Sequence, residues 1–285
     1  MIYAVAALFL NAASRQGVRG LLSTCCCNVF LALFLLAMWD GFALPAAPLP
    51  RWPIVLLGFT FVLGQWLTIV SLSLGEVSVV TPVLGIKVIL VNIILAVGLR
   101  EALSLEIWIG GVLSVLGVAA LQFHRAPKTH APRAGLACIC AFLAALAFAG
   151  ADVLIQHWSP ILSFGHFIPP AMALSALISV ILVMASPAAR VLQHRRSLKA
   201  LLPGGVLLAL QSLLLILTLG HFGRAAEANI IYSSRGVWSV LFVWVIGHLF
   251  ANVELAGRDR GRLIARFAGA LMISAAIILA VTASD

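Results

Sequence analysis

Long apolar runs with very few charged side chains follow one another along the whole chain. Residues 78–98, SVVTPVLGIKVILVNIILAVG, contain one charged side chain, Lys87. Only 9% of the 285 residues are charged and 63% are hydrophobic, whereas roughly a quarter of the residues in an average soluble domain are charged. A chain so poor in charge cannot cover a surface that faces water. The sequence therefore predicts an integral membrane protein.

The length of these runs predicts that they cross the membrane as helices. A helix needs about 20 apolar residues to span the hydrocarbon core, and lipid offers no partner for unsatisfied backbone amides. Apolar and polar residues do not alternate with a period of two, which excludes a β-barrel. We predict an all-α integral membrane fold with ten transmembrane helices at about 1–18, 25–42, 53–74, 77–98, 104–123, 135–157, 167–187, 201–221, 228–250 and 263–282.

The basic residues indicate orientation rather than nucleic-acid binding. The formal net charge is +9, but the lysines and arginines lie in short loops between apolar runs, where they orient the chain in the membrane. Thirteen of them lie in odd-numbered loops and three in even-numbered loops. This excess predicts odd loops in the cytoplasm and both termini outside. Loss of the short first span would reverse this orientation.

An internal repeat relates two apolar segments that each contain one basic residue. The segment GEVSVVTPVLGIKVILVNIILAVG, from Gly75, aligns without a gap with GRAAEANIIYSSRGVWSVLFVWVIG, from Gly223. The alignment superposes Lys87 on Arg235. We therefore predict that the two halves of the chain are copies of one unit.

The predicted boundaries give five spans to each copy. The first repeat covers 1–124, a polar linker covers 125–134, and the second repeat covers 135–285. Gln65 and Gln211 fall at nearly equivalent places in the two copies. Because an odd number of spans turns the second copy over in the membrane, the prediction is two inverted five-helix repeats, a frequent architecture of secondary transporters.

Lys87 and Arg235 are the strongest candidates for a functional role. A charge at the centre of a membrane helix costs about 2.5–3.5 kcal/mol on insertion scales, so both residues are expected to face the bundle interior. Two cations lining one cavity would favour an anion, and the arginine fork suits a carboxylate. In the alternative interpretation, each cation pairs with a buried acid such as Asp152 or Glu227 and is structural.

Asp152 and Glu227 therefore have two candidate roles. A carboxylate at membrane depth can carry a proton because desolvation disfavours its charged form. It can equally be a counter-ion, and for Asp152 we considered Arg235 as the partner. Other polar groups at membrane depth either bond helices together or orient a substrate. The predicted substrate-binding residues are Lys87, Arg235, Gln65, Gln211, Tyr232 and Ser234.

Small residues predict close helix packing, and missing motifs exclude several protein classes. The small residues are Gly110, Gly111, Ser114 and Gly117 in the fifth span and Gly269, Ala270 and Ser274 in the tenth. The five cysteines lack metal-binding spacing, and the chain has no phosphate-binding GxxxxGK[ST] loop and no HExxH motif. We expect no enzyme activity, no metal and no cofactor.

Three sequence features resemble the drug/metabolite transporter superfamily, in its EamA-like branch. The first is LSLGEVSVVTPVLGIKV, a turn of small residues into a helix with an early proline. The second is REALSLEIWIGGVLSVLGVAAL, and the third is a weaker copy of both in GHFGRAAEANIIYSSRGVW and RFAGALMISAAIILA. The second copy departs from the pattern, because Ile230 stands where the first copy has Pro82.

The resemblance implies a secondary transporter in a bacterial plasma membrane. Such a protein moves a small polar or anionic metabolite, amino-acid-like or another carboxylate, by alternating access. Many members of this family are thought to keep both termini in the cytoplasm, in contrast to the loop charges here. In some members the ends of the fifth and tenth helices form a homodimer. The alternatives are a lipid-carrier flippase of the same superfamily and a membrane scaffold without transport.

Overall fold

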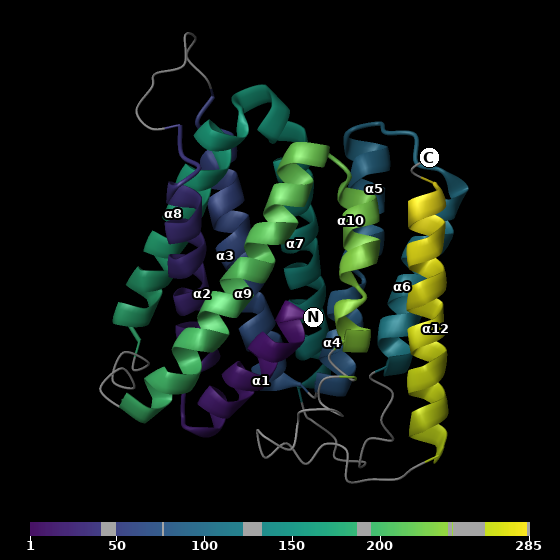
Figure 1. Cartoon of the computed structure of the whole chain (residues 1–285), viewed down its shortest axis with the longest axis horizontal. Coiled ribbons are helices and arrows are strands. Elements are labelled where there is room, and N and C mark those ends of the chain that lie inside the picture. The colour runs from purple at the N-terminus through teal and green to yellow at the C-terminus, as the bar shows by residue number, and fades with distance from the viewer. Residues whose placement is uncertain are drawn as a thin grey trace. The chain divides into compact units, whose positions relative to one another are not determined.

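The computed structural model describes residues 1–40, 50–75, 77–121, 133–186, 195–238, 241 and 260–283, and all regular secondary structure in these ranges is helical (Figure 1). The helices are α1 Ile2–Arg15, α2 Gly20–Leu36, α3 Trp52–Leu74, α4 Val77–Gly85, α5 Lys87–Ile93, the π-helix η1 Ile94–Gly98, α6 Leu105–Leu121, α7 Ala134–Leu162, α8 Phe164–Met184, α9 Arg195–Phe222, α10 Ala225–Tyr232 and α12 Arg260–Thr282. Most of the predicted linker and most of the second half of the predicted ninth span lie outside the described residues.

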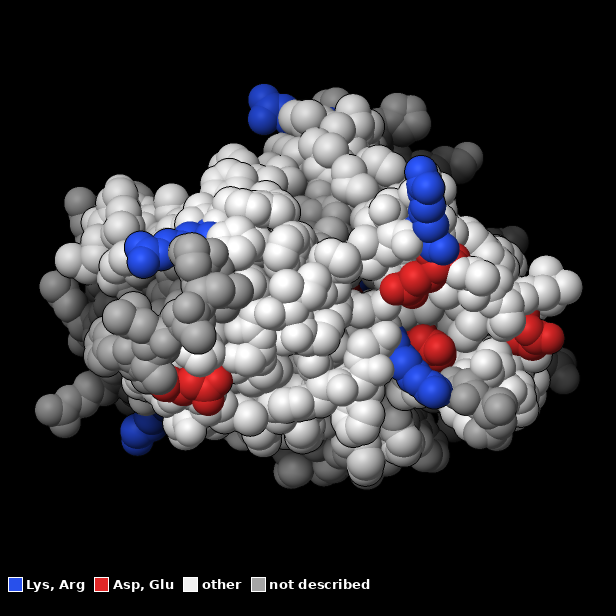
Figure 2. Space-filling model, turned by 90° about the horizontal axis from the view of Figure 1, so that it is seen from above, with Lys and Arg blue, Asp and Glu red and all other residues white. Residues whose placement is uncertain are grey.

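Within the described ranges, six helical segments are long and apolar enough to cross a membrane. They correspond to the predicted third, fourth, sixth, seventh, eighth and tenth spans. The helices α1, α2 and α6 are apolar but shorter. Figure 2 shows a face of the molecule on which uncharged side chains predominate. The chain is an all-helical membrane protein, and the count of ten spans remains a prediction.

Several helix boundaries differ from the predicted ones, and three helices extend at one end by five residues or more. The helix α2 begins at Gly20 rather than near residue 25, because Ser23 and Thr24 are tolerated in a helix in which Thr24 Oγ1 donates to the carbonyl of Gly20 at 3.0 Å. The helix α7 continues past the predicted end at 157 to Leu162 and includes Pro160. The helix α9 begins at Arg195, in a basic segment that was predicted to be loop.

Two predicted continuous spans are interrupted. The first breaks at Ile86, between α4 and α5, where the N–H of Ile86 donates to the carbonyl of Val83 at 3.1 Å instead of one residue further back. The second breaks after α10, at Ser233 and Ser234, before residues 235–238 become helical again. Since the α10 break occurs without a proline in its helix, a proline is not required for such an interruption.

The described residues form two compact units, each built from two distant parts of the chain. The first unit is Met1–Val62 with Leu154–Gly223, and the second is Leu63–Val153 with Arg224–Asp285. Both units therefore combine residues from both predicted repeats. The repeats themselves, 1–124 and 135–285, remain a prediction.

In the first unit, α1 packs against α9, and α2 packs against α8 and α9. A buried hydrogen bond joins two of these helices, since Asn28 Nδ2 donates to Ser179 Oγ at 2.8 Å. Gly205 lies against Cys26, so that α9 can approach α2 closely. Apolar packing between α1, α2, α8 and α9 involves Ala13, Val18, Leu22, Cys25, Val183 and Leu201.

A tight turn between α7 and α8 shapes one end of the first unit. Its central residue, Ser163, has a φ of 61° and accepts a hydrogen bond from the N–H of His166, the third residue of α8. Asp40, which follows α2, lies 3.3 Å from both Ser163 Oγ and His166 Nδ1. Asp40 also lies against Gly165, where a side chain would collide with its carboxylate. The end of α2 is thus fastened to this turn.

In the second unit, α12 packs along α6, and both helices also contact α10 (Figure 1). A methyl group on Gly117 would lie 2.9 Å from the carbonyl oxygen of Gly269. The predicted small faces of the fifth and tenth spans therefore use these glycines for packing within the chain. Ser274 is an exception, because it is exposed and bonds to its own helix at Ala270.

Candidate functional site

An ion pair between α5 and α7 lies at the centre of the second unit's polar groups. Lys87 Nζ lies 2.6 Å from Asp152 Oδ2, and the two side chains are only 14% and 8% exposed. Charges this deeply buried lose most of their hydration, so that each depends on the other for stabilisation. The pair gives Lys87 a partner at membrane depth.

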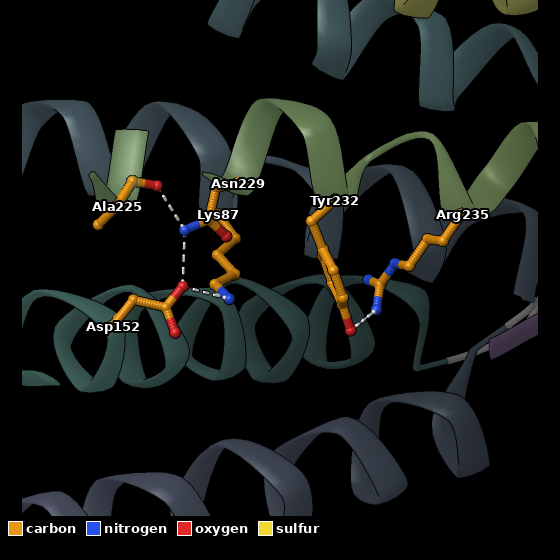
Figure 3. A network of polar contacts seen from close by, with 6 residues as sticks. All are labelled: Lys87, Asp152, Ala225, Asn229, Tyr232 and Arg235. Atoms are coloured by element: carbon orange, nitrogen blue, oxygen red, sulfur yellow. Dashed lines mark hydrogen bonds and ion pairs between the residues drawn. The ribbon is translucent and has the colours of Figure 1, made fainter. Parts of the chain in front are cut away.

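Asn229, from α10, binds to the same carboxylate oxygen. Its Nδ2 donates to Asp152 Oδ2 at 2.7 Å and to the carbonyl of Ala225 at 2.9 Å (Figure 3). Two acceptors on one nitrogen fix the orientation of the amide. Asn229 Oδ1 then has no hydrogen-bond partner among the described residues, although Asn229 is only 1% exposed. A buried acceptor left unpaired is costly and indicates a site for a hydrogen-bond donor.

Tyr232 connects the two cations that the sequence aligned. Arg235 donates from a guanidinium nitrogen to the Tyr232 hydroxyl at 2.7 Å, and its Cζ lies 4.3 Å from the centre of the ring. Lys87 Nζ lies 5.7 Å from the centre of the same ring and 5.8 Å from that of Phe148. These distances are within the range of cation–π attraction. Figure 3 shows Tyr232 between the ends of Lys87 and Arg235.

The two cations occupy equivalent positions in their helices. Lys87 is the first residue of α5 after the break at Ile86, and Arg235 is the first helical residue after the break at Ser233 and Ser234. The same alignment superposes the first residues of α4 and α10, Val77 and Ala225. Breaks in membrane helices expose backbone groups and are tolerated where they are buried in protein or line a cavity. The sequence repeat thus has a counterpart in local structure.

The structure brings together four of the predicted site residues, namely Lys87, Asp152, Tyr232 and Arg235. It pairs Asp152 with Lys87, whereas Arg235 was one partner considered for Asp152 from the sequence. Ser234 lies half-buried in the break beside them. The sum of the charges on Lys87, Asp152 and Arg235 is one positive charge, which favours an anion over a cation.

The other predicted site residues are distributed over three helices. Gln65 is half-buried on α3 in the second unit, and Gln211 is half-buried on α9 in the first unit. Glu227 is half-buried in the first turn of α10, where the helix dipole stabilises an acidic side chain. That location gives Glu227 a role in the helix itself.

Sequence reasoning missed Asn229 and Phe148, both of which contact the ion pair. The sequence spacing of each residue indicated that it shares a helix face with a predicted site residue. Asn229 lies three residues before Tyr232, and Phe148 lies four residues before Asp152, and residues at these spacings share a helix face. A search for polar or aromatic residues one turn away from each buried charge would have found both.

The other polar groups of the unit join helices. Asn92 Nδ2 donates to the carbonyl of Ile107 at 3.3 Å and thereby connects α5 to α6. Ser233 Oγ lies 3.3 Å from Ser114 Oγ, within hydrogen-bond distance, and connects the α10 break to α6. Among the residues that the structure describes, no group of three or more His, Cys, Asp or Glu side chains is arranged to hold a metal ion.

Comparison with known proteins identifies the fold alone. No family model and no curated protein matches the chain. A solved structure described as "Crystal structure of protein" is similar over 100% of this chain and 95% of its own length, with a TM-score of 0.72 at 15% sequence identity. The chain therefore shares an overall fold with a known protein structure.

Proposed function

We propose that the chain is a secondary transporter that moves a small polar or anionic metabolite, amino-acid-like or another carboxylate, across a bacterial plasma membrane. The observation that carries this proposal is the buried cluster of Lys87, Asp152 and Asn229 beside a helix break. Charged residues inside membrane segments are rare and mark substrate or ion pathways. A cluster of this kind is costly to keep in a protein whose only task is to span lipid.

The interrupted helices support the same proposal. In many secondary transporters, the substrate site is formed by discontinuous helices at corresponding positions of two repeats. The breaks before Lys87 and before Arg235 lie at aligned positions. Together with the resemblance to the drug/metabolite transporters of the EamA-like branch, they favour alternating access in which two inverted repeats move around the cluster.

Uptake into proteoliposomes tests this function. The full chain would be reconstituted and offered labelled succinate, lactate, glutamate and alanine under an imposed gradient. We expect uptake of at least one anion, and loss of that uptake in Lys87→Ala and Arg235→Ala. Lys199→Ala is the matched control, because Lys199 is an exposed lysine near the start of α9. Unchanged uptake in both cluster variants would overturn the assignment of this site.

A membrane scaffold without transport is the second candidate, and one observation favours it. The ion pair between Lys87 and Asp152 satisfies both charges within the protein, as a purely structural role requires. In that case the reconstituted chain would move none of the four solutes. Replacement of both residues by apolar ones would then preserve the fold, since a buried ion pair can often be replaced without loss of stability.

A further inference from the structure

The carboxylate of Asp152 uses its two oxygens unequally. Lys87 Nζ and Asn229 Nδ2 both bind to Oδ2, at 2.6 and 2.7 Å. In Figure 3 the other oxygen, Oδ1, has no partner among the residues drawn. The buried Oδ1 of Asn229 also lacks a partner within the described part of the chain. One network therefore holds a carboxylate oxygen open to a proton and an acceptor that a new O–H group can use.

The charges of the pair limit how an anion can bind to Lys87. While Asp152 is ionised, it holds the Lys87 ammonium, and a carboxylate that bound to Lys87 would lie against the carboxylate of Asp152. Two like charges this close repel each other strongly in a poorly hydrated place, even though Arg235 adds one positive charge nearby. A proton on Asp152 removes this repulsion, because the lysine is then free to pair with the incoming anion and the total charge is unchanged.

We propose that this transporter takes up one proton together with each substrate molecule whose carboxylate pairs with Lys87, and that Asp152 is where the proton binds. This inference rests on the proposed transport function. A hydronium ion from the water that reaches the open side of the site gives its proton to Asp152 Oδ1. The ion pair with Lys87 then weakens, and the ammonium turns to the carboxylate of the substrate. On the other side of the membrane the substrate leaves, Asp152 returns the proton to water, and the pair forms again.

Asn229 can form a hydrogen bond with Asp152 in either protonation state. To the carboxylate it donates from Nδ2, as the structure shows. Once Asp152 is protonated and the amide turns, it can offer Oδ1, which has no donor among the described residues. An amide is the side chain suited to this task, since it carries a donor and an acceptor on the same group. Asn229 is thus a positioning residue for the proton.

The described helices α6 and α10 both pack against α5 and together carry three ionisable side chains. Tyr232, on α10, contacts Lys87 through its ring and Arg235 through its hydroxyl. The other acids on the packed elements of this unit are Glu227 in the first turn of α10 and Glu106 in the first turn of α6. Glu106 is exposed to solvent and therefore provides a matched control for loss of a carboxylate.

Proton movement can be measured in proteoliposomes that contain a pH-sensitive dye. Gradients of succinate, lactate, glutamate and alanine are imposed one at a time. For an anion that enters, the lumen of wild-type vesicles should acidify in step with the labelled solute. In Asp152→Asn, which carries an uncharged analogue of the protonated acid, the anion should enter without acidification, and a membrane potential that is positive inside should accelerate it. Glu106→Gln should behave as wild type.

A second measurement does not depend on transport. On acidification, infrared difference spectra of the full chain in detergent should show carbonyl bands from several of its nine Asp and Glu side chains. The band of a poorly hydrated acid among them should be absent from Asp152→Asn, while Glu106→Gln retains it. Lys87→Gln keeps the carboxyl group of Asp152 and should retain the band. The double variant Lys87→Gln/Asp152→Asn also lacks the acid but leaves no unpaired charge. If it folds and lacks the band, loss of the band in Asp152→Asn is due to loss of the acid and not to misfolding.

The outcomes separate the two proposals. If no offered solute enters wild-type vesicles, the transport function fails, and the infrared band still decides whether Asp152 binds a proton. If an anion enters without proton movement, or if Asp152→Asn still acidifies the lumen, the proton inference is overturned while the transport function stands. If the band of the poorly hydrated acid persists in Asp152→Asn, Asp152 is not the proton site.

Discussion

Lys87 and Asp152 lie far apart in the sequence but form a 2.6 Å ion pair that joins α5 to α7. Each charge is buried, so that neither has water to replace its partner. The pair therefore couples the helix that follows a break to one of the longest helices of the chain. Its effect on stability can be separated from its effect on transport.

Removal of one member of this pair should destabilise the protein by about 3–5 kcal/mol, because it leaves an uncompensated buried charge. We expect Lys87→Ala and Asp152→Ala each to lower the free energy of unfolding in mixed micelles by roughly this amount. The exchanged variant Lys87→Asp/Asp152→Lys should recover part of the loss, since it keeps one charge of each sign. If the exchanged variant lost as much free energy of unfolding as the two single variants together, the two residues would not be coupled.

Tyr232 should stabilise Arg235 through two separable interactions. Tyr232→Phe keeps the ring and removes the hydroxyl that accepts from Arg235 at 2.7 Å, at a cost of about 1.5 kcal/mol for a hydrogen bond to a charged group. Tyr232→Leu also removes the cation–π contacts of both cations, for a further loss of about 0.5–1 kcal/mol per contact. A double-mutant cycle with Arg235→Gln measures the coupling, and a coupling energy of zero would contradict the geometry.

The sequence alone predicted the class of the protein and the charged residues of its polar cluster, but not Asn229. Apolar runs of about 20 residues dictate membrane helices, and a charge inside such a run must find a partner within the protein. Lys87, Asp152 and Arg235 were identified for that reason. Which acid joins which cation depends on the packing of α5, α7 and α10, and hydropathy carries no information on that packing.

The helix breaks were not predicted, and their causes are local. The spans that contain Ile86 and Ser233 read as continuous because apolar residues lie on both sides of each break. In the second span, Ser233 Oγ donates to the carbonyl of Ile230 at 2.6 Å, and side chains that bond to nearby backbone compete with helical hydrogen bonds. The first break follows Gly85 and Pro82, two residues that weaken helices.

Close packing of α6 on α12 should depend on the absence of side chains at two glycines. A methyl group on Gly269 would lie 2.7 Å from the carbonyl oxygen of Gly117, and backbone atoms cannot yield as a flexible side chain can. We expect Gly117→Ala and Gly269→Ala each to cost about 1–3 kcal/mol through overpacking. Gly150→Ala is the matched control.

Gly150 lies inside α7, where an added methyl group would meet nothing within 4 Å. Alanine there should stabilise the helix by up to about 1 kcal/mol through its higher helix propensity. Unfolding in mixed micelles measures all three variants. Equal effects at the three glycines would contradict a specific contact between α6 and α12.

Ser163 should be a strained residue whose replacement by glycine stabilises the protein. Its φ of 61° and ψ of 149° belong to a region that is nearly restricted to glycine and costs other residues about 1–3 kcal/mol. Ser163→Gly loses the cap on the N–H of His166, at a cost of only a few tenths of a kcal/mol. Glycine also loses more conformational freedom on folding than serine, which lowers the free energy of unfolding by about 0.5–1 kcal/mol. Strain relief is the largest of these effects, so that we expect a net gain of about 1 kcal/mol. Ser163→Ala, which keeps the strain and loses the cap, should destabilise the protein, and a Ser163→Gly variant no more stable than Ser163→Ala would contradict the strained turn.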